Sequence, residues 1–456
     1  MIAAIFTVAA CLASGWFVAR TLTADAFPGP RWSSLLVELS LATLFGPGLA
    51  SILLLVLLRA RVATPAGVTT AIVALLAACA AIWWRFTPAA PEAAAASKKL
   101  AWSWALWICT GAALIFLLLD FQAAASANPY GEWDAMSIWN LRARFLSSGD
   151  DLWRRAVSFE IGGRMAGAAH PGYPLFLSAF LALPWINSGG FPAGVPIGAS
   201  LLFALAALAL LGASIAARRA PVFGILAWLI LLASEVFASQ TAAQYSDLLQ
   251  ALAFLATLVL LEAAAPDGSA SILIAVGLAA GLSAWIKNEG LPFAGAALAV
   301  ALWRFRLRGA AWLALGAAPG LLATAALKLF LAQGREAVFP QTLGEAIAKI
   351  TTAGRWWQAA LGFGKAIFEA GAWWSHPVLL AALVALAFRF APLPERKARA
   401  WLFIPIALTV AAEYGLYLVT EANLDWHIST SVSRLVAQLW PSFIWLFFLM
   451  LRDVES

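Results

Sequence analysis

Long apolar stretches recur along the whole 456-residue chain, and they constrain its fold more than any other feature. A stretch of about 18 or more apolar residues is long enough to cross the roughly 30 Å hydrocarbon core of a bilayer as a helix. The chain is 63% hydrophobic and 11% charged, whereas soluble domains are roughly half apolar and a quarter charged. The sequence therefore predicts an all-α polytopic membrane protein that forms one integral membrane domain over residues 1–456.

The apolar pattern predicts about 13 transmembrane segments. A further apolar segment, residues 173–186, is too short to cross and is expected to be interfacial or re-entrant. The first segment lacks a basic leader and a clear cleavage site, so a retained helix is expected rather than a signal peptide. The expected spans are 2–22, 34–58, 64–84, 101–119, 192–217, 221–240, 245–264, 270–286, 290–305, 310–331, 377–390, 400–420 and 435–451.

Basic residues in short loops predict which ends of the spans are cytoplasmic. The net charge is +6, but the charges are spread among loops, which favours the positive-inside rule over nucleic-acid binding. Crossings counted from the basic clusters place the two longest loops, about 120–172 and 333–376, on the outer face together with 421–433. Arg59 and Arg61 would also fall outside, so the topology of the first three segments stays open. The expected cytoplasmic clusters are Arg85, Lys98 and Lys99; Arg218 and Arg219; Arg304, Arg306 and Arg308; and Arg389, Arg396, Lys397 and Arg399.

The cysteines and the loop carboxylates define no cofactor site. Cys11, Cys79 and Cys109 lie in apolar stretches without a CxxC or Cys/His spacing, so neither a disulfide framework nor a zinc site is expected. The loops carry carboxylates without clear metal-ligand spacing. A divalent metal stays possible, and no cofactor is predicted with certainty.

The first outer loop contains the stretch richest in acidic, basic and aromatic side chains, NPYGEWDAMSIWNLRARFL at 128–146. A helical period puts Asp134 on one stripe with Ile138, Leu141 and Phe145, opposite Trp133, Met136, Trp139 and Ala143. A carboxylate on an apolar stripe requires a partner, a raised pKa or a functional role.

Two interpretations of Asp134 are open. It caps its helix or pairs with Arg142 or Arg144, or it is a general base that faces a water-poor outer cavity. Glu132 is the alternative acid for the second role. Farther along, His170 either caps a turn or belongs to the same site, and all three histidines (His170, His376 and His427) fall in predicted outer loops.

These residues resemble the GT-C-fold glycosyltransferases that use polyisoprenyl-phosphate sugars, including protein O-mannosyltransferases and lipid A aminoarabinose transferases. The resemblance covers the layout of nearly the whole chain. It departs where the histidine motif has one proline followed by glycine instead of a proline pair, and where no large soluble C-terminal domain follows. The residues that carry it are Asp134 in an aromatic-rich loop helix, the run His170-Pro171-Gly172-Tyr173-Pro174, Tyr245-Ser246-Asp247, Lys287-Asn288-Glu289-Gly290, and Trp426 to Ser431 with Arg434.

The resemblance implies transfer of a sugar from a polyprenyl-phosphate donor to a glycan, lipid or protein acceptor, on the periplasmic or outer face of a bacterial inner membrane. Asp134 would be the catalytic base, and Lys287, Arg434 and His427 would hold the donor phosphate near the membrane boundary. Asp247 and Glu289 would orient sugar or acceptor, with His170 and Tyr173 nearby. The alternatives are headgroup snorkelling for the cations and a simple salt bridge between Glu289 and Lys287.

A transporter or lipid flippase is the main competing function. Transporters place ionisable residues along a pathway inside the spans, and here these are few, chiefly Glu235, Lys328 and Glu413. A non-catalytic scaffold would not require an acid on an apolar stripe. The second outer loop is basic and rich in tryptophan, which is typical of an interfacial helix or of a lid.

Overall fold

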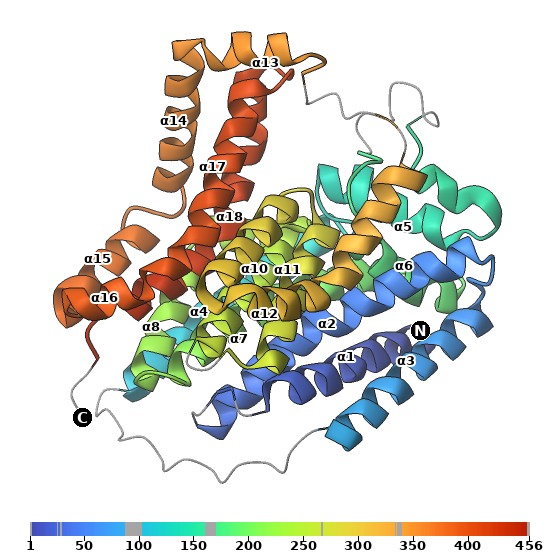
Figure 1. The fold of residues 1–456 in the computed structure, drawn as a ribbon, viewed down its shortest axis with the longest axis horizontal. Helices are drawn as coiled ribbons and strands as arrows, with labels where there is room; N and C mark the ends of the chain where they lie inside the picture. Colours follow the sequence, from blue (N-terminus) through green and yellow to red (C-terminus); the bar gives the residue numbers. More distant parts are fainter. Residues whose placement is uncertain are drawn as a thin grey trace.

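The computed structural model describes residues 2–24, 26–27, 30–86, 103–159, 170–265, 268–332, 334 and 340–453. Within these residues the chain is helical throughout, apart from turns and an isolated antiparallel bridge between Phe390 and Leu451 (Figure 1). Lys98 and Lys99 of the first predicted basic cluster lie outside the described residues.

In the described part, 9 helices are long and apolar enough to cross a membrane, or 10 if a bent pair forms one span. The chain is therefore a polytopic membrane protein, but the expected count of about 13 is not confirmed. Predicted spans 270–286 and 377–390 form helices of only 17 and 12 residues, α11 (Ala270–Ile286) and α15 (Pro377–Phe388). The long helices are α1 (Ile2–Thr23), α2 (Arg31–Arg59), α3 (Pro65–Phe86), α4 (Ser103–Ala127), α7 (Gly194–Ala216), α10 (Asp247–Ala264), α12 (Gly290–Ala326) with the π-helical turn η4 (Leu327–Leu331), α16 (Leu393–Arg399) with α17 (Phe403–Val419), and α18 (Leu424–Met450).

One predicted span is bent, and two others form a hairpin. The predicted span 221–240 is α8 (Pro221–Leu232) followed by α9 (Glu235–Ala243), which are bent by 69°. Helix α12 contains Arg306 at φ 63° and ψ −170°, where the chain reverses. Its first arm runs antiparallel to α11 and its second arm runs parallel to α11, so the predicted spans 290–305 and 310–331 are the two arms of one hairpin. The contacts that give these directions are Gly268–Phe305 and Ser283–Gly290 for the first arm, and Ile274–Gly316 and Ala284–Thr324 for the second.

One end of the bundle gathers the basic clusters. Arg218 pairs with Glu262 at 2.7 Å, and Arg219 donates to the carbonyls of Leu449 and Leu451. The last carbonyls of a helix have no partner inside it, so Arg219 satisfies the end of α18. Arg399 donates to the same Leu449 carbonyl at 2.8 Å. Clusters that the positive-inside rule assigns to one side therefore meet in space.

The opposite end carries the first loop and is called the outer end after the orientation predicted from charge. Arg61 approaches Asp151 of that loop at 3.8 Å, so Arg61 lies at the same end as the loop. Helix α6 (Phe176–Ser188) starts and finishes here. Before it, the Gly172 carbonyl accepts a hydrogen bond from Lys328, and after it the Phe191 carbonyl accepts one from Tyr130. Both ends of this short buried helix therefore lie at one end of the bundle, as expected of an interfacial or re-entrant segment.

The predicted outer loop 421–433 is mostly helix. Asn423 caps α18 by accepting a hydrogen bond from the Trp426 N–H at 3.0 Å, and the helix is 27 residues long. Hydroxyl side chains such as Thr430 donate hydrogen bonds to carbonyls of their own helix. This polar segment can therefore form one continuous helix with the apolar segment that follows it. The 424–434 segment therefore presents its side chains from a rigid helix.

Two helices of the second outer loop stand beside the projecting ends of α17 and α18 (Figure 1). They are α13 (Leu343–Ile350), which begins with a capping box, and α14 (Ala353–Phe368). Arg355 donates to the carbonyls of Tyr417, Leu418 and Thr420, and so satisfies the C-terminal end of α17.

Candidate functional site

Asp247 is the centre of an ion-pair network at the outer end. It begins α10 and its side chain is fully buried. Its Oδ1 accepts hydrogen bonds from Lys287 Nζ at 2.9 Å and Gln438 Nε2 at 2.6 Å, and its Oδ2 accepts one from Arg434 Nε at 3.0 Å. A buried carboxylate is tolerated only when it is paired and hydrogen-bonded, and this one is.

Arg434 connects this centre to the acid of the first loop. Its Nη1 lies 2.5 Å from Asp134 Oδ2, which brings together residues 300 positions apart in the chain. The guanidinium carbon also lies 4.5 Å from the centre of the Tyr245 ring, and the Tyr245 hydroxyl accepts a hydrogen bond from the Asp134 N–H at 3.4 Å. Burial raises the pKa of Tyr245, so its phenol stays protonated.

Neither local interpretation of Asp134 holds. Asp134 makes no side-chain capping bond in the structure. Arg142 is buried and donates instead to the backbone carbonyls of Ala156 and Tyr173. Arg144 lies over the ring of Tyr130. The partner of Asp134 is distant in sequence, and no local pattern points to it.

The helical stripe expected around Asp134 is shifted. Residues Ala135–Trp139 form a π-helical turn, η1, before α5 (Asn140–Ser147). An extra residue in the turn changes the face on which later side chains lie. Ile138 is buried as expected, but Trp139 and Ala143, expected on the opposite side, are buried too.

Lys287 and Glu289 extend the network along the turn after α11. Lys287 Nζ lies 2.9 Å from Glu289 Oε1 as well as from Asp247, so the predicted salt bridge within this motif is present. Burial by itself lowers the pKa of Lys287, but the two carboxylates outweigh burial, and the net pKa is above its ordinary value. The ammonium group is therefore charged at neutral pH.

The two remaining predicted motifs flank the network. The rings of His170 and Tyr173 stack with centres 4.7 Å apart, and Tyr173 in turn stacks on Trp139. The Tyr173 phenol is near enough to act on the charges of both Lys287 and Arg434. His427 lies in the first turn of α18. Its Nδ1 is 3.1 Å from Thr420 Oγ1, and its ring centre is 4.8 Å from that of Tyr417.

The third predicted outer histidine has a structural role. His376 accepts a hydrogen bond from the Val378 N–H at 3.3 Å and so caps α15. No contact of His376 with the ion-pair network is seen within the described residues.

Sequence reasoning missed Gln438, which completes the shell of Asp247. A glutamine in the apolar run VAQLWP, one helical turn after Arg434, was the available signal. Tyr245 was recognised only as part of a motif, although it contacts both Asp134 and Arg434.

The exposure of the network indicates where a ligand would enter. The Asp247 side chain is 0% exposed, whereas those of Arg434 and Asp134 are 16% and 23% exposed. The network is therefore sealed at its base and open toward Asp134. No group of three His, Cys, Asp or Glu side chains able to hold a metal is found in the described part of the chain. The positive charge of the network comes from Lys287 and Arg434.

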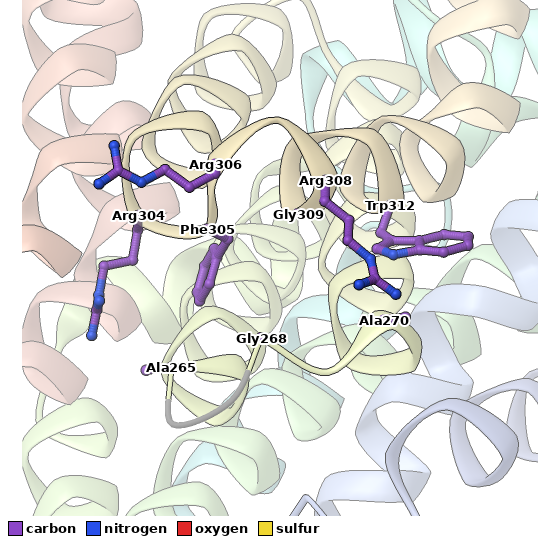
Figure 2. A pocket seen from close by; sticks show the side chains of 9 residues that line it. All are labelled: Ala265, Gly268, Ala270, Arg304, Phe305, Arg306, Arg308, Gly309 and Trp312. Carbon is purple, nitrogen blue, oxygen red and sulfur yellow. The ribbon is translucent and has the colours of Figure 1, made fainter.

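An open pocket lies far from this chemistry, at the end with the basic clusters (Figure 2). Its volume is about 480 Å³, and the described residues of its walls include three arginines and no carboxylate. Arg308 extends beside Trp312, while Arg304 and Arg306 point away from them. Arginines at helix ends commonly reach lipid headgroups, which is the simplest explanation of this surface.

No protein-family model matches this chain, and no curated protein or solved structure is similar enough to it to indicate a family.

Proposed function

We propose that this protein is a GT-C-type membrane glycosyltransferase, a bundle of about 13 crossings that transfers a sugar from a polyprenyl-phosphate donor to a glycan, lipid or protein acceptor. Its site would face the periplasm or exterior of a bacterial inner membrane. The observation that carries the proposal is the bridge from Asp134 through Arg434 to Asp247 and Lys287. It joins a candidate base to two cations at the outer end of the helices.

Asp134 is the general base in this proposal. Arg434 occupies its Oδ2, and no partner of Oδ1 is seen among the described residues, which leaves that oxygen for an acceptor hydroxyl or amine. The base takes the acceptor proton as the acceptor attacks the anomeric carbon. Such assistance contributes about 10² to 10⁴ in rate.

Arg434 and Lys287 stabilise the departing polyprenyl phosphate. Arg434 uses Nε and Nη1 in its ion pairs, and within the described part of the chain its Nη2 meets no acceptor. The network has two cations against the three carboxylates of Asp134, Asp247 and Glu289. A phosphate would therefore compete with a carboxylate for Arg434, and the exposed Asp134 is the one that gives way. Donor binding would thus release the base.

A transporter or lipid flippase is the second candidate. The complete burial of Asp247 and the short buried helix α6 favour it. Its weakness is position, because Asp247 and Lys287 sit where α10 begins and α11 ends.

A transfer assay in proteoliposomes distinguishes the two candidates. Wild-type protein is supplied with polyprenyl-phosphate-linked sugars and with candidate acceptors, beside Asp134→Asn and Glu132→Gln. We expect transfer by wild type and by the Glu132 variant, and a loss of at least about 100-fold in Asp134→Asn. Bilayer movement of lipids without any sugar transfer would instead support the flippase.

A further inference from the structure

Glu413 is a buried carboxyl group that the proposed chemistry does not use. It lies in α17, its residue is 4% exposed, and neither carboxylate oxygen has a hydrogen-bond partner among the described residues. An ionisable side chain inside a membrane helix is costly, and such residues commonly mark binding sites or pathways.

The buried face of α17 aims Glu413 toward the candidate site. Thr409, Glu413, Tyr417 and Thr420 follow a helical period and are all buried. Tyr417 bonds to Ser431 of α18 at 2.7 Å, which fixes this face against the helix of Arg434. The chain reverses between α17 and α18, so Glu413, one turn before Tyr417, is level with Arg434, about one turn after Ser431.

Two neighbours of Asp247 also present unused acceptor oxygens. Glu289 Oε2 and Gln438 Oε1 are buried and have no partner within the described residues, although the other polar atom of each side chain is bonded in the network. Buried acceptors are normally satisfied, by protein, water or ligand. Together with the two oxygens of Glu413, these are four buried oxygen atoms without a hydrogen-bond partner among the described residues.

We propose that Glu413, with Glu289 and Gln438, forms the subsite for the sugar ring of the donor and accepts hydrogen bonds from its hydroxyl groups. This inference rests on the proposed function. Glu289 is paired with Lys287, and Gln438 binds the same carboxylate as Arg434, so a sugar bonded to a phosphate on these cations would lie near their unused oxygens. Sugar hydroxyl groups supply the missing donors, and they can also accept a hydrogen bond that a neutral carboxyl group donates. The substrate class is a hydroxyl-rich sugar on a polyprenyl phosphate.

The test separates recognition of the sugar from recognition of the phosphate. Purified protein in nanodiscs is titrated with polyprenyl-phosphate mannose, glucose and galactose and with the bare polyprenyl phosphate. We expect wild type to bind at least one sugar-bearing lipid more tightly than the bare lipid. Glu413→Leu should shrink that preference by about tenfold, because it removes the hydrogen bonds between this carboxyl group and the sugar hydroxyls. Its affinity for the bare lipid should stay unchanged.

Two further variants control for structural damage. Glu413→Gln keeps the size and one acceptor oxygen, so we expect an intermediate preference. Thr409→Val, one turn deeper on the same face of α17, should behave as wild type. An unaltered preference in both Glu413 variants, or an equal loss of affinity for all four lipids, would overturn the subsite and leave the transfer assay unaffected. A wild-type protein that neither transfers sugar nor prefers any sugar-bearing lipid would overturn the proposed function itself.

Discussion

Arg434 holds Asp134 and Asp247 with different nitrogen atoms of one guanidinium group, Nη1 for the first and Nε for the second. The planar fork fixes the angle between the two carboxylates, and the face of the group lies over Tyr245. A lysine can supply the charge but neither the fork nor the stacking. The arrangement therefore links a loop acid to a helix that is far away in sequence.

Arg434→Lys should lose transfer while keeping the fold. Because one ammonium group cannot reproduce both contacts, we expect activity to fall by about 100-fold, in the range typical for the loss of an electrostatic stabiliser. Transfer kinetics and elution volume in size-exclusion chromatography measure the two effects. Arg155→Lys, an exposed arginine of the first loop, is the matched control. Wild-type rates in Arg434→Lys would show that the fork has no role.

Lys287 should contribute strongly to stability because its removal leaves Asp247 with less compensation. Breaking a buried ion pair on one side costs about 3–5 kcal/mol, whereas replacing both partners is often much less harmful. We therefore expect Lys287→Met to lower the melting temperature more than the double variant Lys287→Met/Asp247→Asn does. Thermal unfolding in detergent measures the melting temperatures of both variants. A double variant that melts at a lower temperature than Lys287→Met would show that the two residues are not coupled.

The stabilising effect of Lys287 should not depend on pH across the neutral range. Its pKa in the folded protein is raised above the ordinary 10.5, because Asp247 and Glu289 outweigh the opposing effect of burial. A raised pKa means that the stabilisation is fully present below pH 10.5 and is lost only as the pH rises through the higher folded value. The melting-temperature difference between wild type and Lys287→Met should thus be constant between about pH 6 and 9. A difference that shrinks within this window would mean that the amine is neutral in the folded state.

The parts of this protein that composition controls were predictable from the sequence. Helix bounds at both ends of α1 and α11 agree closely with the apolar runs, because hydrophobic length is a property of the segment itself. The meeting of basic clusters at one end was predictable for a similar reason, because the positive charge of each loop sets the side on which that loop lies. The reversal at Arg306 also agrees with the break between the predicted spans 290–305 and 310–331. The 69° bend between α8 and α9 depends on neighbouring helices and was not marked in the hydropathy pattern.

The sequence indicated which residues belong to the site but not which of them pair with each other. Asp134, Asp247, Lys287, Glu289 and Arg434 were all selected, and their roles in catalysis stay predictions. Local spacing suggested Arg142 or Arg144 as the partner of Asp134, yet the partner is Arg434, because tertiary packing brings α18 to the first loop. Spacing along a helix carries no information about such contacts.

Docking of α13 and α14 onto α17 should depend on Arg355. This side chain makes three hydrogen bonds to carbonyls at the end of α17, at 2.8 to 3.2 Å. Arg355→Ala removes all three and leaves helix-terminal acceptors unsatisfied, so we expect faster amide hydrogen exchange across residues 343–368. If these helices cover the candidate site, transfer should fall several-fold, chiefly through weaker donor binding. Lys365→Ala, an exposed residue of α14 whose charge lies 3.8 Å from Glu369, should leave both exchange and transfer unchanged. Equal exchange in wild type and Arg355→Ala would show that α13 and α14 are held by apolar packing alone.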